Sequence, residues 1–120
     1  MAINDVPQKF FSRLNSALKT GDFSLVLDVF VPTSIMEYKM RGPQKFINPE
    51  LITDGLKSML KKGANYVISE PAVGGNRVAV NFDLYNSGPN KITGTVIFTA
   101  NEKDKITYLV FEPGWNKSQG

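Results

Sequence analysis

The sequence contains neither cysteine nor histidine among its 120 residues. Without cysteine there is no disulfide, no thiolate nucleophile and no zinc-thiolate or iron–sulfur site. Without histidine the chain lacks the commonest general base and the usual imidazole metal ligand, and it cannot build a Ser-His triad. Any catalysis must use Asp, Glu, Tyr, Lys or Arg, and we expect neither a metal nor a cofactor.

Long apolar runs and strong charge are also missing. No stretch approaches the roughly 20 apolar residues of a membrane span, and the first five residues lack the basic and apolar regions of a signal peptide. Lys and Arg total 14 against 11 Asp and Glu, which gives a net charge of only +3. We therefore expect a cytoplasmic protein without a membrane span, and the composition does not favour nucleic-acid binding.

What the chain does contain is typical of one globular domain. Hydrophobic residues make up 42% and charged residues 21% of a length that suits a single core. We expect a single domain over residues 1–115 and a flexible tail over residues 116–120.

Helical spacing dominates the first half of the chain. Asp5 and Pro7 mark the beginning of a first helix, and Gly21 ends it. A second, short helix follows Asp22, carries Phe30 and ends before Pro32. The third helix extends from a cap at Asn48 to Gly63. Its predicted buried face consists of Leu51, Ile52, Leu56, Met59 and Leu60.

Alternating patterns predict the strands. A short strand covers residues 34–40 and is followed by a loop over residues 41–44. Four more strands, separated by turns, fill the second half: 66–72, 77–85, 91–100 and 105–112. Helices followed by consecutive antiparallel strands indicate an α+β domain.

The order of these elements, together with Ala17-Leu18-Lys19-Thr20-Gly21-Asp22-Phe23 and the later Phe30, resembles the nuclear transport factor 2-like superfamily, which includes ketosteroid isomerases and polyketide cyclases. The resemblance spans nearly the whole chain. It implies a cystatin-like cone, with three N-terminal helices packed in a curved antiparallel sheet. One scaffold of this kind hosts many activities, so the resemblance is informative about the fold and not about the function.

The residues that act in ketosteroid isomerases are not carried over. The positions that hold their tyrosine, aspartic acid and carboxylate base correspond here to Leu14, Val96 and Tyr38. Glu37 is adjacent to the last of these, but neighbouring strand residues point to opposite faces of a sheet. The lack of histidine also excludes the chemistry of the scytalone dehydratase kind.

Strand alternation and helix faces predict an apolar lining for the cone. Its candidate polar groups, and the candidate catalytic residues, are Tyr38, Glu37 and Tyr66. Trp115 is either a lid over the mouth of the cone or a packing anchor for the tail. The other candidate ligand-binding residues are Phe10, Leu14, Phe30, Met36, Leu56, Val80, Phe82, Val96, Phe98, Leu109 and Phe111.

The opposite face of the sheet is unusually apolar and β-branched, and we expect a homodimer through this outer face. Lys39, Arg41 and Lys45 form either a solvated basic surface or a site that attracts the anionic head of a ligand. The residues predicted on the outer face are Thr93, Thr95, Ile97, Thr99, Ile106, Tyr108 and Val110.

Two functions fit these observations. In the first, the cone binds a small apolar molecule and either carries it or acts as a cofactor-independent isomerase or cyclase on a polyketide- or terpenoid-like substrate. In the second, the chain is a non-catalytic dimerisation or protein-interaction module. Tyrosine hydroxyls that point into the cone favour the first function, and a cone filled by Phe10, Phe82, Phe98 and Phe111 favours the second.

Overall fold

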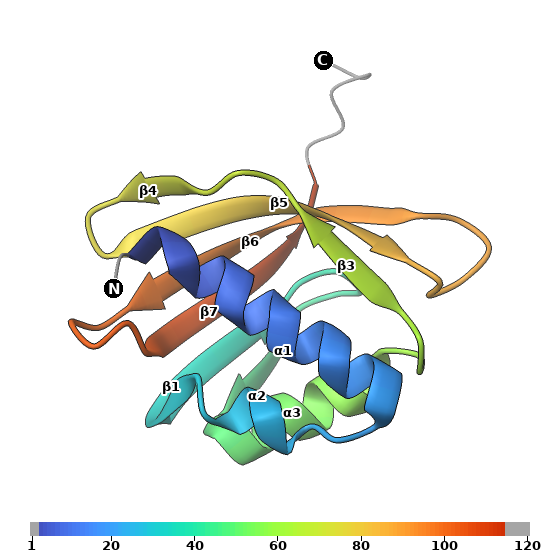
Figure 1. Ribbon diagram of the computed structural model, residues 1–120, viewed down its shortest axis with the longest axis horizontal. Coiled ribbons are helices and arrows are strands. Elements are labelled where there is room, and N and C mark those ends of the chain that lie inside the picture. Colours follow the sequence, from blue (N-terminus) through green and yellow to red (C-terminus); the bar gives the residue numbers. More distant parts are fainter. Residues whose placement is uncertain (1–2, 115–120) are drawn as a thin grey trace.

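A strongly curved sheet wraps around one long helix in the computed structural model, which describes residues 3–114 (Figure 1). The strand order is β2-β1-β7-β6-β5-β3, and β4 pairs with β5. The helical elements are η1 (Ile3–Asp5), α1 (Val6–Thr20), α2 (Ser24–Leu27) and α3 (Pro49–Met59). The strands are β1 (Phe30–Tyr38), β2 (Gln44–Ile47), β3 (Asn65–Ile68), β4 (Ala72–Gly74), β5 (Arg77–Tyr85), β6 (Ile92–Ala100) and β7 (Ile106–Pro113).

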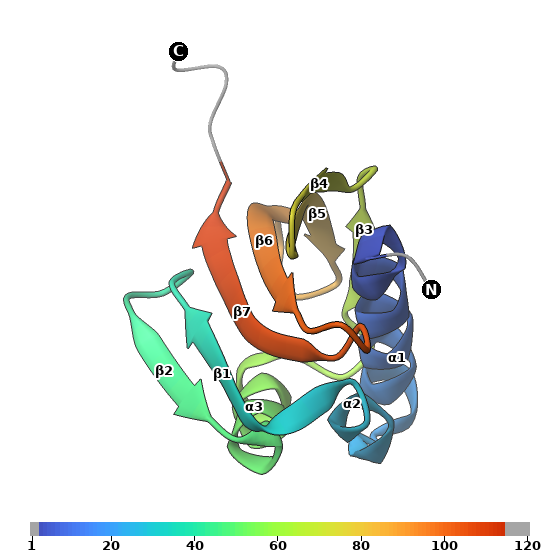
Figure 2. The same ribbon diagram turned by 90° about the vertical axis from the view of Figure 1, so that its left-hand side faces the viewer.

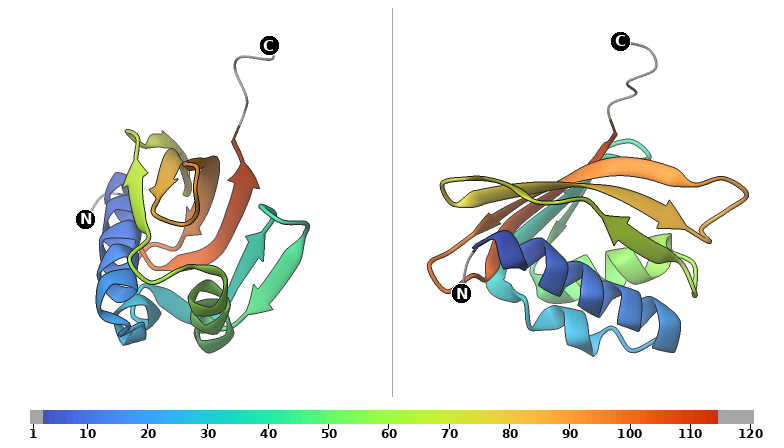
Figure 3. Two further views of the ribbon diagram at one scale, coloured as in Figure 1. Left: turned by 90° about the vertical axis from the view of Figure 1, so that its right-hand side faces the viewer. Right: turned by 45° about the horizontal axis from the view of Figure 1, so that its top comes forward.

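The curvature of the sheet places α1 on its concave side. From β2 through β1, β7, β6 and β5, the sheet bends round until β3 lies beside α1 (Figure 2). In the left-hand view of Figure 3, α2 and α3 lie at the bottom of the molecule and close this side of the enclosed space. The core therefore occupies the hollow of the sheet, between its concave face and α1.

Local sequence signals explain where the helices begin and end. Gly21 has a φ of 87°, and its N–H donates to the carbonyl of Ala17 at 2.7 Å, which confirms the predicted stop of α1. The Asn48 side chain accepts a hydrogen bond from the N–H of Leu51 at 2.9 Å, so the predicted cap of α3 is confirmed. Within residues 3–114, no helix is both long and apolar enough to cross a membrane.

The prediction of three N-terminal helices is not confirmed. Only α1 is long, α2 has four residues, and α3 follows two strands. Phe30, predicted at the end of the second helix, is instead the first residue of β1. The N–H of Ile106 donates to the carbonyl of Val29 at 2.8 Å, so pairing with β7 draws this segment into the sheet. Tertiary pairing here overrides the local helical pattern.

The sheet also differs from the antiparallel prediction. β1 and β7 pair in parallel. Parallel pairing needs a long crossover connection, and the elements from β2 to β6 supply it. The predicted strand 66–72 is interrupted at Ser69-Glu70-Pro71, since proline cannot donate to a ladder, and β3 and β4 pair with different parts of β5. The predicted loop 41–44 is shorter than expected, because Gln44 begins β2.

Three single residues depart from the predicted pattern. Leu51 is 45% exposed, and α3 ends at Met59 because Leu60 adopts an extended backbone. Ile106, predicted on the outer face, is buried in the core, because the register between β6 and β7 shifts after Thr99. The predicted positions of Trp115 and of the tail 116–120 lie outside the described residues.

Gly94 leaves space on β6 for the ring of Phe82. A Cβ atom at this position would lie 2.6 Å from the ring of Phe82 and 2.6 Å from the carbonyl oxygen of Glu112. Both neighbours come from strands that pair with β6, so neither can move without disturbing the sheet. Gly94 is therefore required for close packing of Phe82 against β6.

We predict that Gly94→Ala lowers the free energy of unfolding by about 1–3 kcal/mol through overpacking. Gly88→Ala is the matched control, since no atom lies within 4 Å of a Cβ built there, and its effect should stay within about 0.5 kcal/mol. Urea denaturation at pH 7 measures both values. Equal stability of the two variants would contradict the packing argument.

Candidate functional site

Aromatic rings fill the hollow of the sheet. Phe10 and Phe11 of α1 lie edge-on to each other at a centroid distance of 5.0 Å, and both contact Phe98 and Phe111 from the sheet. Neighbouring rings in the cluster are separated by 4.9 to 6.4 Å, the range of favourable aromatic contacts. The members of this aromatic cluster are Phe10, Phe11, Phe30, Tyr38, Tyr66, Phe82, Phe98 and Phe111.

The structure brings together the apolar residues that the sequence predicts for the lining. All of those that lie within the described residues are buried members of one core. These residues are Phe10, Leu14, Phe30, Met36, Leu56, Val80, Phe82, Val96, Phe98, Leu109 and Phe111. An interior of this kind offers hydrocarbon and aromatic surface and almost no polar groups.

Tyr66 is the exception, because its hydroxyl carries a polar group into this interior. The residue is 3% exposed, and the hydroxyl oxygen has no hydrogen-bond partner among the described residues. Its ring packs between Phe11, at 4.9 Å, and Phe82, at 5.2 Å. Burial, and to a lesser degree the neighbouring Tyr38, raise the pKa of the Tyr66 phenol well above its usual value of 10.0. The phenol therefore keeps its proton at neutral pH, and its O–H can donate a hydrogen bond.

Tyr38 comes from the opposite side of the same cluster. It is 6% exposed, and its ring lies 5.2 Å from that of Phe111, which Tyr66 also contacts at 6.4 Å. Burial raises the pKa of the Tyr38 phenol, and the positive charge of Arg41 opposes part of that rise. Two neutral phenols thus flank the ring of Phe111.

Glu37, the third candidate catalytic residue, lies on the outer face of the sheet. It pairs with Val110 of β7, one position along β1 from the inward-facing Tyr38. The hydroxyl of Tyr108 donates to its carboxylate, and the ammonium of Lys39 lies 3.9 Å from the other carboxylate oxygen. This carboxylate therefore does not face the aromatic cluster.

Asn15 is a site residue that the sequence patterns did not indicate. Its side-chain amide donates to the carbonyl of Tyr66 at 2.9 Å and accepts from the N–H of Tyr66 at 2.8 Å. A signal was present, because Asn15 follows Phe11 by four residues and so lies on the same helix face. A half-buried amide beside an apolar stripe needs a hydrogen-bond partner, but the sequence does not show which strand supplies it.

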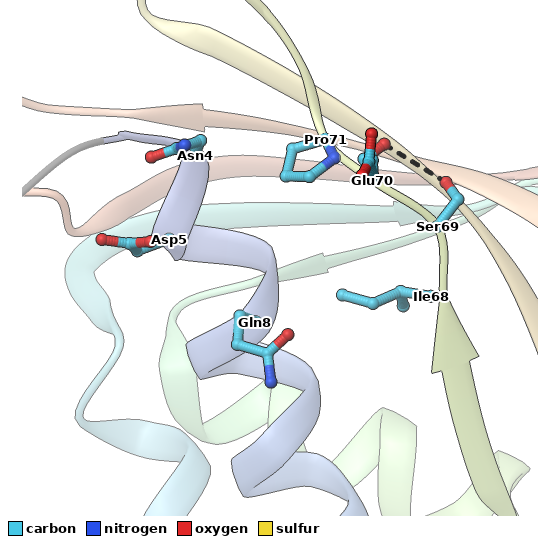
Figure 4. A pocket seen from close by; sticks show the side chains of 7 residues that line it. All are labelled: Asn4, Asp5, Gln8, Ile68, Ser69, Glu70 and Pro71. Atoms are coloured by element: carbon cyan, nitrogen blue, oxygen red, sulfur yellow. Dashed lines mark hydrogen bonds between the residues drawn. The ribbon is translucent and has the colours of Figure 1, made fainter.

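Two grooves follow the line where α1 meets β3. The first has a volume of about 410 Å³, and its walls include Phe11, Asn15 and Tyr66. The second, of about 380 Å³, lies near the beginning of α1 (Figure 4). It shares Gln8 and Ile68 with the first groove. Within residues 3–114, no three Asp or Glu side chains gather into a group that could hold a metal ion.

Solved structures share this architecture. A nuclear transport factor 2-like protein from Anabaena variabilis matches with a TM-score of 0.76 and 17% identity, over 96% of this chain and 92% of that one. A protein from Sinorhizobium meliloti, proposed to be a polyketide cyclase, matches with a TM-score of 0.69 and 22% identity, over 90% and 94%. A proposed ketosteroid isomerase from Kribbella flavida matches with a TM-score of 0.73 and 11% identity, over 95% and 80%. No protein-family model and no curated protein matches the chain.

Burial of the Tyr66 phenol predicts a loss of stability in alkali. In the unfolded chain this phenol releases its proton near pH 10, whereas the folded chain retains it to higher pH. The free energy of unfolding should therefore fall as the pH rises above 10, by at most about 1.4 kcal/mol per pH unit for one such group. Tyr38 contributes in the same direction.

Urea denaturation between pH 8 and 11 measures this slope. Tyr66→Phe should make it shallower, while Tyr85→Phe, which removes a 40% exposed phenol outside the aromatic cluster, is the matched control. If Tyr66→Phe kept the full wild-type slope, the phenol would not be buried in its neutral form.

Proposed function

Because this chain has the nuclear transport factor 2-like fold, we propose that it binds a small apolar molecule inside the curved sheet and that Tyr66 donates a hydrogen bond to an oxygen atom of that molecule. The observation that carries this proposal is the unpartnered hydroxyl of Tyr66 within an apolar core. Within residues 3–114, the other buried polar side chains are satisfied; the hydroxyl of Ser34, for example, donates to the carbonyl of Ile106 at 2.6 Å.

An unsatisfied buried hydroxyl is costly, by about 1–3 kcal/mol. Phenylalanine would fill the same space without this cost, so packing alone does not account for a tyrosine at position 66. An acceptor atom on a ligand would remove the cost and at the same time orient the ligand. Tyr38, on the other side of Phe111, supplies a second donor to the same region.

The surroundings of the two phenols define the class of ligand. The candidate lining residues are hydrocarbon or aromatic, which suits a polyketide- or terpenoid-like molecule with one or two oxygen atoms. Aromatic edges and faces in the cluster can contact the rings of such a ligand as they contact one another. Proteins proposed to be a polyketide cyclase and a ketosteroid isomerase share the fold.

Any reaction in this site would be a non-redox isomerisation or cyclisation. Glu37 lies on the outer face, so the two phenols are the ionisable candidates at the cluster. Two neutral phenols can stabilise negative charge that develops on a ligand oxygen, and the enclosing walls can hold a flexible chain in a reactive conformation. The chemistry would therefore depend on hydrogen-bond donation and enclosure, without a carboxylate base.

The aromatic rings fill the interior, and this favours a second function, that of a non-catalytic interaction module. Ligand binding requires at least one ring of the aromatic cluster to move, whereas an interaction module requires no movement. The outer face supports this alternative, because Ile35, Tyr108, Val110 and Ile97 occupy paired positions across β1, β7 and β6. The chain would then act by dimerisation through this outer face.

A second copy of the chain is the occupant that fits the outer face. Acidic and basic side chains lie beside its apolar centre. Glu37 is opposite Lys45 in the pairing of β1 with β2, and its carboxylate lies 3.9 Å from the ammonium of Lys39. A twofold axis through such a face brings apolar residues together and lets acidic groups of one copy meet basic groups of the other.

Ligand binding is tested with two probes of equal shape: 2-acetylnaphthalene, a ketone, and 2-isopropenylnaphthalene, in which a CH₂ group replaces the carbonyl oxygen. The wild-type chain should bind both and should prefer the ketone by about fivefold, the value of one hydrogen bond of ~1 kcal/mol. Tyr66→Phe should remove this preference, and Tyr38→Phe should reduce it. Equilibrium dialysis measures the affinity of each of these three proteins for each probe.

Tyr85→Phe is the matched control for these measurements and should bind like the wild type, because Tyr85 lies outside the aromatic cluster. Absence of binding of either probe to the wild-type chain would overturn the proposal and leave the interaction module as the better reading.

The interaction module is tested by charge on the outer face. Ile97→Lys should shift the sedimentation coefficient from that of a dimer to that of a monomer, because a lysine at the centre of the interface is desolvated without a partner. Asn90→Lys adds the same charge in an exposed turn and should leave the dimer intact. A wild-type monomer at micromolar concentration would exclude the predicted homodimer.

A further inference from the structure

Tyr66 is held in place by a side chain of α1 at the free edge of the sheet. Among the strands of residues 3–114, β3 is the last of the sheet and has one strand neighbour, β5. Its residues alternate between pairs that are hydrogen-bonded to β5 and pairs that are not. The backbone N–H of Ser69 donates to the carbonyl of Asn81 at 2.9 Å, so Ser69 is in a hydrogen-bonded pair. Two residues earlier, Val67 is therefore also in a bonded pair, and Tyr66 is in a non-bonded pair with Leu84. The backbone N–H and C=O of Tyr66 therefore point away from the sheet.

Asn15 satisfies both of these groups with one side chain. Its amide nitrogen donates to the Tyr66 carbonyl at 2.9 Å, and its amide oxygen accepts from the Tyr66 N–H at 2.8 Å. This is the two-point pattern that a neighbouring strand would supply. The amide is half-buried, so these hydrogen bonds are only partly exposed to competition from water.

The same helix also holds the ring of Tyr66. Phe11, one turn before Asn15, packs against that ring at 4.9 Å. The backbone and the side chain of Tyr66 are thus both fixed by α1, through two residues on one helix face. A four-residue edge strand with one neighbour would otherwise be free to fray or slip.

We propose that Asn15 is a positioning residue for the ligand site: by pairing with the backbone of Tyr66, it holds the Tyr66 hydroxyl where it meets the ligand oxygen. This inference rests on the function proposed above and adds a residue to it that touches no ligand. Loss of the amide leaves the aromatic cluster in place but allows β3 to shift, and the hydroxyl loses its orientation. Asn15 thereby sets the selectivity of the site for an oxygen-bearing ligand.

The test uses the same pair of naphthalene probes with Asn15→Ala and Asn15→Asp in the full chain. Aspartate keeps an acceptor for the Tyr66 N–H but cannot donate to the Tyr66 carbonyl when it is ionised. We expect both variants to lose most of the roughly fivefold preference for 2-acetylnaphthalene while binding of 2-isopropenylnaphthalene changes less than twofold. Ser12→Ala, at an exposed position of the same helix, is the matched control and should keep the preference.

A double-mutant cycle separates positioning from a general loss of stability. If Asn15 acts through Tyr66, the variant with both Asn15→Ala and Tyr66→Phe should show the same probe preference as Tyr66→Phe alone. The infrared carbonyl band of bound 2-acetylnaphthalene is a second readout, because it should move to lower frequency in the wild-type chain and return in Asn15→Ala. These comparisons are made at temperatures where circular dichroism shows each variant folded.

The outcomes distinguish the two proposals. A wild-type ketone preference that persists in folded Asn15→Ala, or an equal loss of affinity for both probes, overturns the positioning role and leaves the binding function intact. Failure of the wild-type chain to bind either probe overturns the binding function itself.

Discussion

Packing of α1 into the hollow of the sheet is the interaction on which the rest of the structure depends. Phe10 and Phe11 occupy consecutive positions of this helix and contact rings from β1, β3, β5, β6 and β7. A sheet that curves this far leaves a space too wide for its own side chains, and two adjacent phenylalanines fill it from the helix side. The same packing requires Gly94, because a Cβ atom there would clash with the ring of Phe82 and with the backbone of β7. Helix, bend and aromatic core are therefore a single packing solution.

Within this core, Tyr66 is the residue that packing does not explain. Folding favours a satisfied or an apolar interior, and the hydroxyl of Tyr66 is neither. Stable proteins keep such groups mainly where a function requires them. Asn15 fixes the place of Tyr66, because its side chain hydrogen-bonds the backbone of Tyr66 from the same helix that packs Phe11 against the Tyr66 ring. The two faces of the sheet carry different groups: the concave face encloses the aromatic rings and the two phenols, and the outer face carries Glu37 and Tyr108.

The distribution of ionisable groups limits the chemistry of the concave side. Tyr38 and Tyr66 are neutral hydrogen-bond donors at physiological pH, because a phenol has a pKa near 10 and burial raises the pKa of both further. Glu37 is next to Tyr38 in the sequence but lies on the other face of β1, with Lys39 and Tyr108. A site with donors and no acceptor base is suited to holding an oxygen atom and to stabilising charge on it, and not to removing a proton from carbon.

The sequence alone determined the class of fold, most strand positions and the apolar residues of the core, because these depend on local periodicity and on the caps at Gly21 and Asn48. It also excluded histidine and cysteine chemistry. Only the tertiary structure decided that Phe30 begins a strand, since its partner in β7 is distant in the chain. The same holds for the contact between Asn15 and Tyr66, which lie 51 residues apart. A polar residue on a helix face does not reveal which backbone it will meet, because hydrogen-bond partners are chosen by the packing of the whole chain and not by neighbouring residues.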